Sequence, residues 1–148
     1  FGHAEGKEPE YGYNLALDRI QSKPRERSLV EYVPPPKHFY EEFFKDIVGV
    51  SHVKDARKEH IVIRARSLYI FKLMDTKPIH QSYIVVKPYA QYVDGEYAES
   101  SVDVEPNNEF FGRILQMGAG LEIVSPESVR DEMAKRVQDL TYLYPKKE

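Results

Sequence analysis

Residues Asn107–Pro126 restrict the fold more than any other stretch, because they carry signals for a helix, a strand and the start of a second helix within one short span. Asn107 is a good N-cap, since its side-chain oxygen can accept a hydrogen bond from an amide of the first helical turn. Gly118 and Gly120 can adopt the left-handed conformation that ends a helix. Elements this close together must share one hydrophobic core. The apolar residues at helical spacing after the cap are Phe110, Phe111, Ile114 and Leu115.

A short strand over Leu121–Val124 and a second helix come next in the sequence. Ser125 is expected to be the N-cap of that helix and Pro126 its first residue, because a proline fits the first helical position without losing a hydrogen bond. The helix should pack against the same core. Its apolar line consists of Val129, Met133, Val137 and Leu140.

The middle of the sequence predicts three more strands and one more helix. The strands are expected over His60–Arg66, Gln81–Tyr89 and Tyr97–Glu105. Ser67 can cap a short helix after the first of them, and Asp94-Gly95 is a typical hairpin turn before the third. The order strand, helix, strand, strand, helix, strand, helix predicts an α+β fold, a ferredoxin-like βαββαβ sandwich with an extra C-terminal helix. Right-handed crossovers place the first strand beside the third.

The first third of the chain has a different pattern, with a strand expected over Tyr13–Ile20 and a helix over His38–Val48 that Gly49 ends. Pro34–Pro36 forms a stiff connector and marks the best domain boundary. The fold class therefore includes a partial β-rich segment and a linker helix before the ferredoxin-like part. We predict three regions, which are the β-rich segment at residues 1–33, the proline connector with its helix at 34–56, and the ferredoxin-like domain at 57–148.

Composition and charge exclude several classes of protein. A hydrophobic content of 41% with 30% charged residues is typical of a soluble globular chain, and the net charge of −3 provides no general attraction to nucleic acid. The absence of cysteine excludes disulfides and thiolate chemistry. No apolar run approaches the roughly 20 residues that span a bilayer, so we expect no membrane contact.

Motifs for catalysis or metal binding are also missing. None of the GxSxG, GxGxxG or P-loop patterns is present, and no pair of carboxylates is placed for acid–base work. The histidines show neither HxH nor HExxH spacing. We therefore expect no catalytic residue, no metal and no cofactor, and hence a protein that is not an enzyme. The histidines are His3, His38, His52, His60 and His80.

Four blocks of sequence, taken in order and at their spacing, resemble the bacterial WYL-domain transcriptional regulators. They are LALDRI at Leu15–Ile20, HFYEEFFKDIVGV at His38–Val50, KPIHQS at Lys77–Ser82 and FFGRILQMGAGLEIVSPESVRDEM at Phe110–Met133. The last block is similar to the C-terminal WCX extension of that family, in the version found in Bacteroidetes-like sequences. The Trp-Tyr-Leu motif that names the family is absent. Because relatives carry that motif shortly before a loop that resembles FGHAEG, we expect a fragment that begins after it, with residues 1–33 as the end of a WYL domain.

The resemblance implies the effector-sensing and dimerising region of a cytoplasmic bacterial regulator. The partners it implies are a second copy in a homodimer, the N-terminal helix-turn-helix DNA-binding domain of the same full-length chain, and a nucleotide or single-stranded nucleic acid as effector. Two other interpretations fit the residues, namely an ACT-like small-molecule sensor and a purely structural dimerisation module. A helix-turn-helix pattern in the preceding sequence would favour the regulator, and a catalytic domain there would favour the sensor.

Arg19 is the first candidate for effector binding. The resemblance implies that it lies on a strand beside the ligand groove, where its guanidinium can bind phosphate oxygens bidentately. An ion pair with Asp18 is the alternative, and the two interpretations have about equal weight.

Three further candidates lie in the ferredoxin-like region. Arg64 and Arg66 are expected on the sheet face away from the helices, with Tyr83 able to stack on a base of a single-stranded nucleic acid. Glu99 and Asp103 are expected on the same face of the third strand. Cross-strand ion pairs with them would neutralise both arginines, and we favour those pairs.

The same open face is expected to be an association surface, for a second copy or for the rest of a WYL domain. Val62, Tyr83, Val85 and Val124 are predicted to lie on it, which is much apolar area to leave among ion pairs. The alternative is a solvated face with scattered apolar residues.

Overall fold

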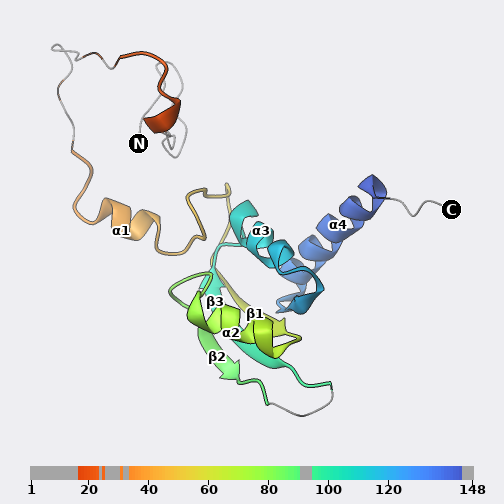
Figure 1. The fold of residues 1–148 in the computed structure, drawn as a ribbon. Helices are drawn as coiled ribbons and strands as arrows, with labels where there is room; N and C mark the ends of the chain where they lie inside the picture. The colour runs from red at the N-terminus through yellow and green to blue at the C-terminus, as the bar shows by residue number, and fades with distance from the viewer. Residues whose placement is uncertain (1–16, 24, 26–30, 32–33, 91–94, 145–148) are drawn as a thin grey trace. The chain divides into compact units, whose positions relative to one another are not determined.

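The computed structural model describes residues 17–23, 25, 31, 34–90 and 95–144. The chain divides into two compact units, Phe1–Phe43 and Phe44–Glu148. Figure 1 shows the elements in order along the chain. The finer division into three regions stays a prediction.

The described part of the first unit contains two short helices, η1 at Leu17–Arg19 and α1 at Phe39–Phe43. η1 is a 3-10 turn where a strand was expected, so that prediction is wrong for its last residues, while residues 13–16 lie outside the described part of the chain. No described strand pairs with this segment, and an extended chain without a partner leaves its amides unpaired. In α1, Phe39 packs edge-on against Tyr40, with ring centroids 5.3 Å apart.

α1 ends earlier than the sequence predicted, because the residues after it turn toward the sheet of the second unit. The Glu105 amide donates to the Asp46 carbonyl at 2.7 Å, and Ile47 forms a parallel bridge with Glu105. Ile47 and Val48 are buried there. Burying these two side chains is more favourable than continuing the helix, so tertiary packing overrides the local helix propensity. Gly49 then takes a φ of +77°, a conformation that favours glycine, but it lies after the end of α1 and does not end that helix as predicted.

The second unit is an antiparallel four-stranded sheet in the order β2-β3-β1-β4 with helices packed against it (Figure 1). The first strand lies beside the third, which confirms the predicted α+β, ferredoxin-like arrangement with an extra C-terminal helix. Its elements are β1 (Glu59–Ala65), α2 (Leu68–Thr76), β2 (Ile84–Lys87), β3 (Ala98–Val104), α3 (Asn108–Gln116), η2 (Gly118–Gly120), β4 (Leu121–Ser125) and α4 (Glu127–Leu143).

One face of the sheet is covered and forms the core. Ile61 of β1 lies opposite Val102 of β3, and Ile63 lies opposite Ser100 and Ile123. All are buried, because alternate residues of a strand point to the same side and the helices pack over that side. The apolar side chains that the helices add to this core are Met74, Phe110, Phe111, Ile114 and Val129.

The N-cap residue of α3 links the start of this helix to the segment before β1. The Asn107 side-chain oxygen accepts from the Phe110 amide at 2.8 Å, as the sequence predicted. Its amide nitrogen also donates to the carbonyls of Val48 and Ser51, each at 2.8 Å. One fully buried side chain therefore begins the helix and fixes the segment before β1.

In the second unit, the extent of β2 and the start of α4 also differ from the sequence predictions. β2 is shorter than Gln81–Tyr89, since the Tyr83 amide donates to the His80 carbonyl in a turn and Pro88 has no amide hydrogen to extend the ladder. At the start of α4, Pro126 takes the N-cap position that was expected for Ser125, and the helix begins at Glu127.

Candidate functional site

The open face of the sheet carries a set of ion pairs, and Arg64 of β1 is at its centre. The Nε and Nη2 atoms of Arg64 donate to Glu99 Oε1 at 3.1 and 2.7 Å. The guanidinium also lies 4.3 Å from the ring centroid of Tyr97, where a cation is attracted to the π face. The hydrogen bond to Glu99 raises the pKa of Arg64. Arg64 therefore has the carboxylate partner that the sequence predicted.

Arg66 also has a carboxylate partner, but a different one from Asp103. Its Nε donates to Glu122 Oε2 at 3.0 Å, and Nη2 contacts the same oxygen. Arg130 of α4 contacts the other oxygen of Glu122 at 3.3 Å. Burial favours the neutral form of Glu122, but the hydrogen bond from Arg66 and the surrounding arginine charges lower its pKa below the ordinary value. Asp103 is held instead by His60, with Nδ1 and Oδ1 2.7 Å apart.

Tyr83 is not on this face. Its hydroxyl oxygen accepts a hydrogen bond from Ser100 at 2.7 Å, and Ser100 lies on the covered side of β3. Burial raises the pKa of Tyr83, which packs against the core. The expectation that Tyr83 and the two arginines share one surface is therefore wrong, because the turn before β2 sets a register opposite to the expected one. Arg19 lies in η1 of the other unit.

The register also reverses the two apolar positions of β2. Val85 lies opposite Ser100 and so points to the covered side, whereas Ile84 lies opposite Ser101 on the open side. Ile84 is 62% exposed and Val86 59%. The open face therefore has an exposed apolar side chain on an edge strand, Ile84, and Val85 is not on this face.

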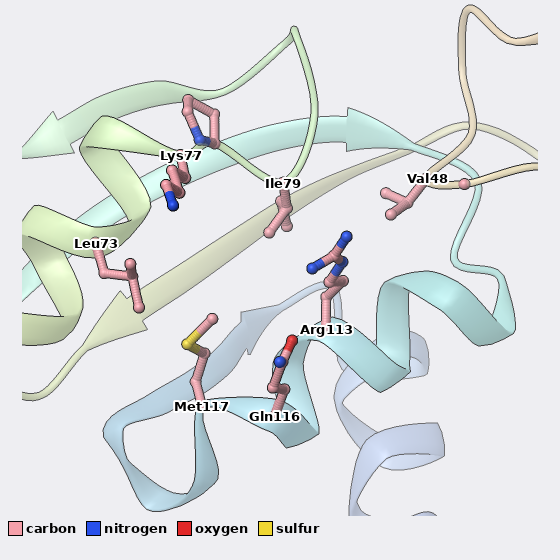
Figure 2. Close-up of a pocket in the computed structure, with 9 residues that line it drawn as sticks. Val48, Leu73, Lys77, Ile79, Arg113, Gln116 and Met117 are labelled. Atoms are coloured by element: carbon pink, nitrogen blue, oxygen red, sulfur yellow. The ribbon is translucent and has the colours of Figure 1, made fainter.

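A second candidate site lies on the helix side of the unit, and no sequence motif indicated it. A pocket of about 420 Å³ opens between the end of α2, the loop after it and α3. Figure 2 shows Arg113 and Gln116 rising from α3 toward Ile79, with Leu73 and Lys77 on the other wall. The remaining lining residues are Val48, Gly49, Pro78 and Met117.

The polar groups of this pocket are two cations and an amide. Lys77 is the C-cap of α2 and Arg113 lies in the last turn of α3. Neither side chain forms an ion pair within the described part of the chain, and no acidic side chain is among the residues that line the pocket. Basic residues in two distant parts of a sequence give no signal that they will line one pocket, which is why sequence reasoning missed them.

An apolar groove of about 590 Å³ lies between α3, β4 and α4. The groove is lined by Leu115 of α3 and by Met133 and Leu140 of α4, among others. Part of the predicted apolar line of α4 therefore borders this groove instead of being fully packed in the core. In the ranges that the structure describes, no cluster of three or more histidine or acidic side chains is arranged to hold a metal ion. Within the same ranges no helix has the length and hydropathy to cross a membrane.

A family comparison matches part of the second unit. Residues 75–141 match the WCX domain. This domain is the C-terminal extension of WYL-domain regulators, and the match runs from the end of α2 through most of α4. It covers less than half of the chain and supports a regulatory rather than an enzymatic context. No curated protein shows a significant match.

Proposed function

We propose that the chain is the effector-sensing and dimerisation region of a bacterial WYL-type transcription regulator acting in the cytoplasm. The observation that carries this proposal is the match of residues 75–141 to the WCX domain. In this proposal promoter binding belongs to an N-terminal helix-turn-helix domain of the same full-length chain. The described unit then supplies a stable sheet with one face free for a ligand or a partner.

The proposed effector is a nucleotide or a short single-stranded nucleic acid that contacts Arg64 and Arg66. Both guanidiniums are held on the open face by carboxylates, and Arg66 is about half exposed. A phosphate group can replace a carboxylate on a guanidinium because both accept two parallel hydrogen bonds. Tyr97 takes the stacking role expected of Tyr83, since its ring already lies against Arg64. Arg19, which lies in the first unit, stays a separate candidate for phosphate binding.

Dimerisation is proposed to use the free edge of β2. This strand is the last in the sheet order, so one side of its backbone has no ladder partner in the described fold. Exposed Ile84 and Val86 provide apolar area beside that edge. Edge strands with exposed apolar side chains are prone to pair with another chain.

The proposal is tested by fluorescence anisotropy of labelled short single-stranded DNA and RNA with the whole chain, in competition with nucleotides. We expect saturable binding that weakens as salt rises. The double variant Arg64→Gln/Arg66→Gln should bind several-fold more weakly. The control Lys72→Gln/Lys135→Gln removes the same charge from exposed sites elsewhere and should bind like the parent.

Two results would count against this assignment. Equal loss in the control variant would show general charge attraction instead of a site, and no binding of any of these ligands would remove the effector part of the proposal. Duplex DNA of the same sequence serves as a further control. We expect no tight duplex binding, because the net charge is −3 and residues 94–109 contain six carboxylates and no lysine or arginine. Sedimentation of the same samples tests the dimer.

A further inference from the structure

The pocket between α2 and α3 combines a cationic lining with an apolar floor. Lys77 and Arg113 contribute the charges, and Gln116 contributes an amide that can donate a hydrogen bond. Leu73 and Ile79 are half-buried beside them. This combination differs from the core, which is apolar, and from the open face, where arginines and carboxylates alternate.

Arg113 has a natural helix partner that it does not use. Glu109 lies four residues earlier on α3, a spacing at which opposite charges usually pair. However, Glu109 Oε1 accepts from the Ser51 hydroxyl at 2.9 Å and from the Val50 amide at 3.3 Å. Its side chain packs where a Cβ on Gly49 would meet it at 2.8 Å. The glycine thus lets the carboxylate turn toward Val50 and Ser51, while Figure 2 shows the Arg113 guanidinium directed into the pocket.

The partial negative charges at the C-terminal ends of α2 and α3 balance only part of the positive charge of Lys77 and Arg113. Basic residues are favourable near a helix C-terminus, and Lys77 and Arg113 lie at the ends of α2 and α3. Each C-terminus carries roughly half a negative charge. Two such ends therefore offset about one of the two positive charges, which leaves an excess of about one among the side chains that line the pocket. A bound anion would neutralise that excess.

We propose that this pocket binds a small organic anion, a phosphate monoester or a carboxylate carried on an apolar body. Lys77 and Arg113 hold the anionic group, Gln116 donates to it, and the apolar body lies against Leu73 and Ile79. The volume of about 420 Å³ lies within the range of roughly 300–1,000 Å³ that is usual for small-molecule sites. The pocket lies on the opposite side of the sheet from Arg64, so this site stands independently of the proposed open-face effector.

The test is a titration of the isotope-labelled whole chain followed by amide NMR shifts. Phenyl phosphate and benzoate are the probes, and they distinguish a phosphate from a carboxylate head group. Benzyl alcohol lacks the charge and inorganic phosphate lacks the apolar body, so both should bind at least several-fold more weakly. We expect saturable shifts at the amides of Lys77, Ile79, Arg113 and Gln116. The amides of Arg64 and Glu99 should stay in place.

Variants then assign the contacts. Arg113→Gln and Lys77→Gln should each weaken the better probe several-fold, and Gln116→Glu, which adds a negative charge with almost no change of shape, should weaken it about tenfold. Lys72→Gln removes a charge from an exposed part of α2 outside the pocket and is the matched control for Lys77→Gln. Gln138→Glu on exposed α4 is the matched control for Gln116→Glu.

Three outcomes would overturn the proposal. The first is the absence of saturable shifts at the pocket with both probes, and the second is equal weakening in the control variants, which indicates long-range charge alone. The third is a fall in melting temperature for Lys77→Gln and Arg113→Gln without binding by the parent, which means that the cations serve only the helix ends. The spectrum of each variant also reports whether it is folded.

Discussion

The covered and open faces of the sheet are made from alternate residues of the same strands, yet different interactions stabilise them. On the covered face Ile61 and Val102 are fully buried and belong to the same core cluster as the aromatic residues of α3. On the open face the corresponding positions carry ion pairs such as Arg64–Glu99, with side chains 23% and 22% exposed. Apolar burial stabilises by about 25 cal/mol per Å², whereas partly exposed ion pairs contribute about 1 kcal/mol or less. The covered face should therefore carry the stability, and the open face should stay free to exchange its partners.

The largest effect is expected for Phe110→Ala. Phe110 is 0% exposed and its ring centroid lies 5.5 Å from that of Phe111, so truncation leaves a cavity in the centre of the core. We expect a loss of about 3–5 kcal/mol in the free energy of unfolding, measured by urea denaturation. The control is Tyr69→Ala on α2, an aromatic residue that is 73% exposed, with an expected loss below about 0.5 kcal/mol. Similar losses for the two variants would contradict the division between the faces.

The next effect is expected for Asn107→Ala, which should cost about 2–4 kcal/mol. About 1 kcal/mol comes from the lost helix cap, and about 1–3 kcal/mol from buried groups left without partners. Asn107→Asp separates the two contributions, because it keeps the acceptor for the Phe110 amide and loses the donors to Val48 and Ser51. If Asn107→Asp unfolds at the same urea concentration as the parent, the two donated hydrogen bonds contribute nothing.

Substitutions at two neighbouring residues of β2 test which face of the sheet each residue occupies. Val85→Glu places a charge on the covered side and should cost about 1–3 kcal/mol in urea denaturation. Ile84→Glu places the same charge on the open side and should change stability by less than about 0.5 kcal/mol. In sedimentation, Ile84→Glu should dissociate a dimer that uses this edge. Equal unfolding costs for the two variants would show that the register of β2 is not the one described.

Much of the fold could be predicted because its signals are local. The alternation in β1 and β3, the caps at Ser67 and Asn107, and the glycine exit at Gly118 each depend on a few adjacent residues. The structure confirms them. The predictions failed where a contact between distant parts of the sequence decided the structure. Ile47, for example, lies within the predicted helix His38–Val48 but forms a bridge with Glu105 after the end of β3.

The candidate sites show the same limit. The pairing of Arg64 with Glu99 was predictable, since cross-strand neighbours follow once the register of two adjacent strands is known. The side of Tyr83 was not predictable, because the turn before β2 is also held by a distant contact, in which Ser82 Oγ accepts a hydrogen bond from the Asp103 amide at 2.9 Å. The pocket could not be predicted from the sequence for a further reason. Lys77 and Arg113 line the same pocket only because their helices pack side by side on the sheet.

The smallest effect concerns Glu122, and it depends on pH. The arginines around this carboxylate lower its pKa in the folded state, so the stability it contributes is present above the unfolded-state pKa, which is about 4.3 for a glutamate. That contribution is lost as the pH falls through the lowered, folded-state pKa. Glu122→Gln should therefore be less stable than the parent near neutral pH by less than about 1 kcal/mol, and the difference should shrink toward zero in acid, where the parent side chain is also neutral. Urea denaturation of both proteins across the acid range measures the gap. Asp139→Asn, which removes an exposed charge from α4 without breaking an ion pair that the structure shows, is the control. A gap between Glu122→Gln and the parent that stays constant on acidification would mean that Arg66 and Arg130 do not hold the carboxylate in its charged form.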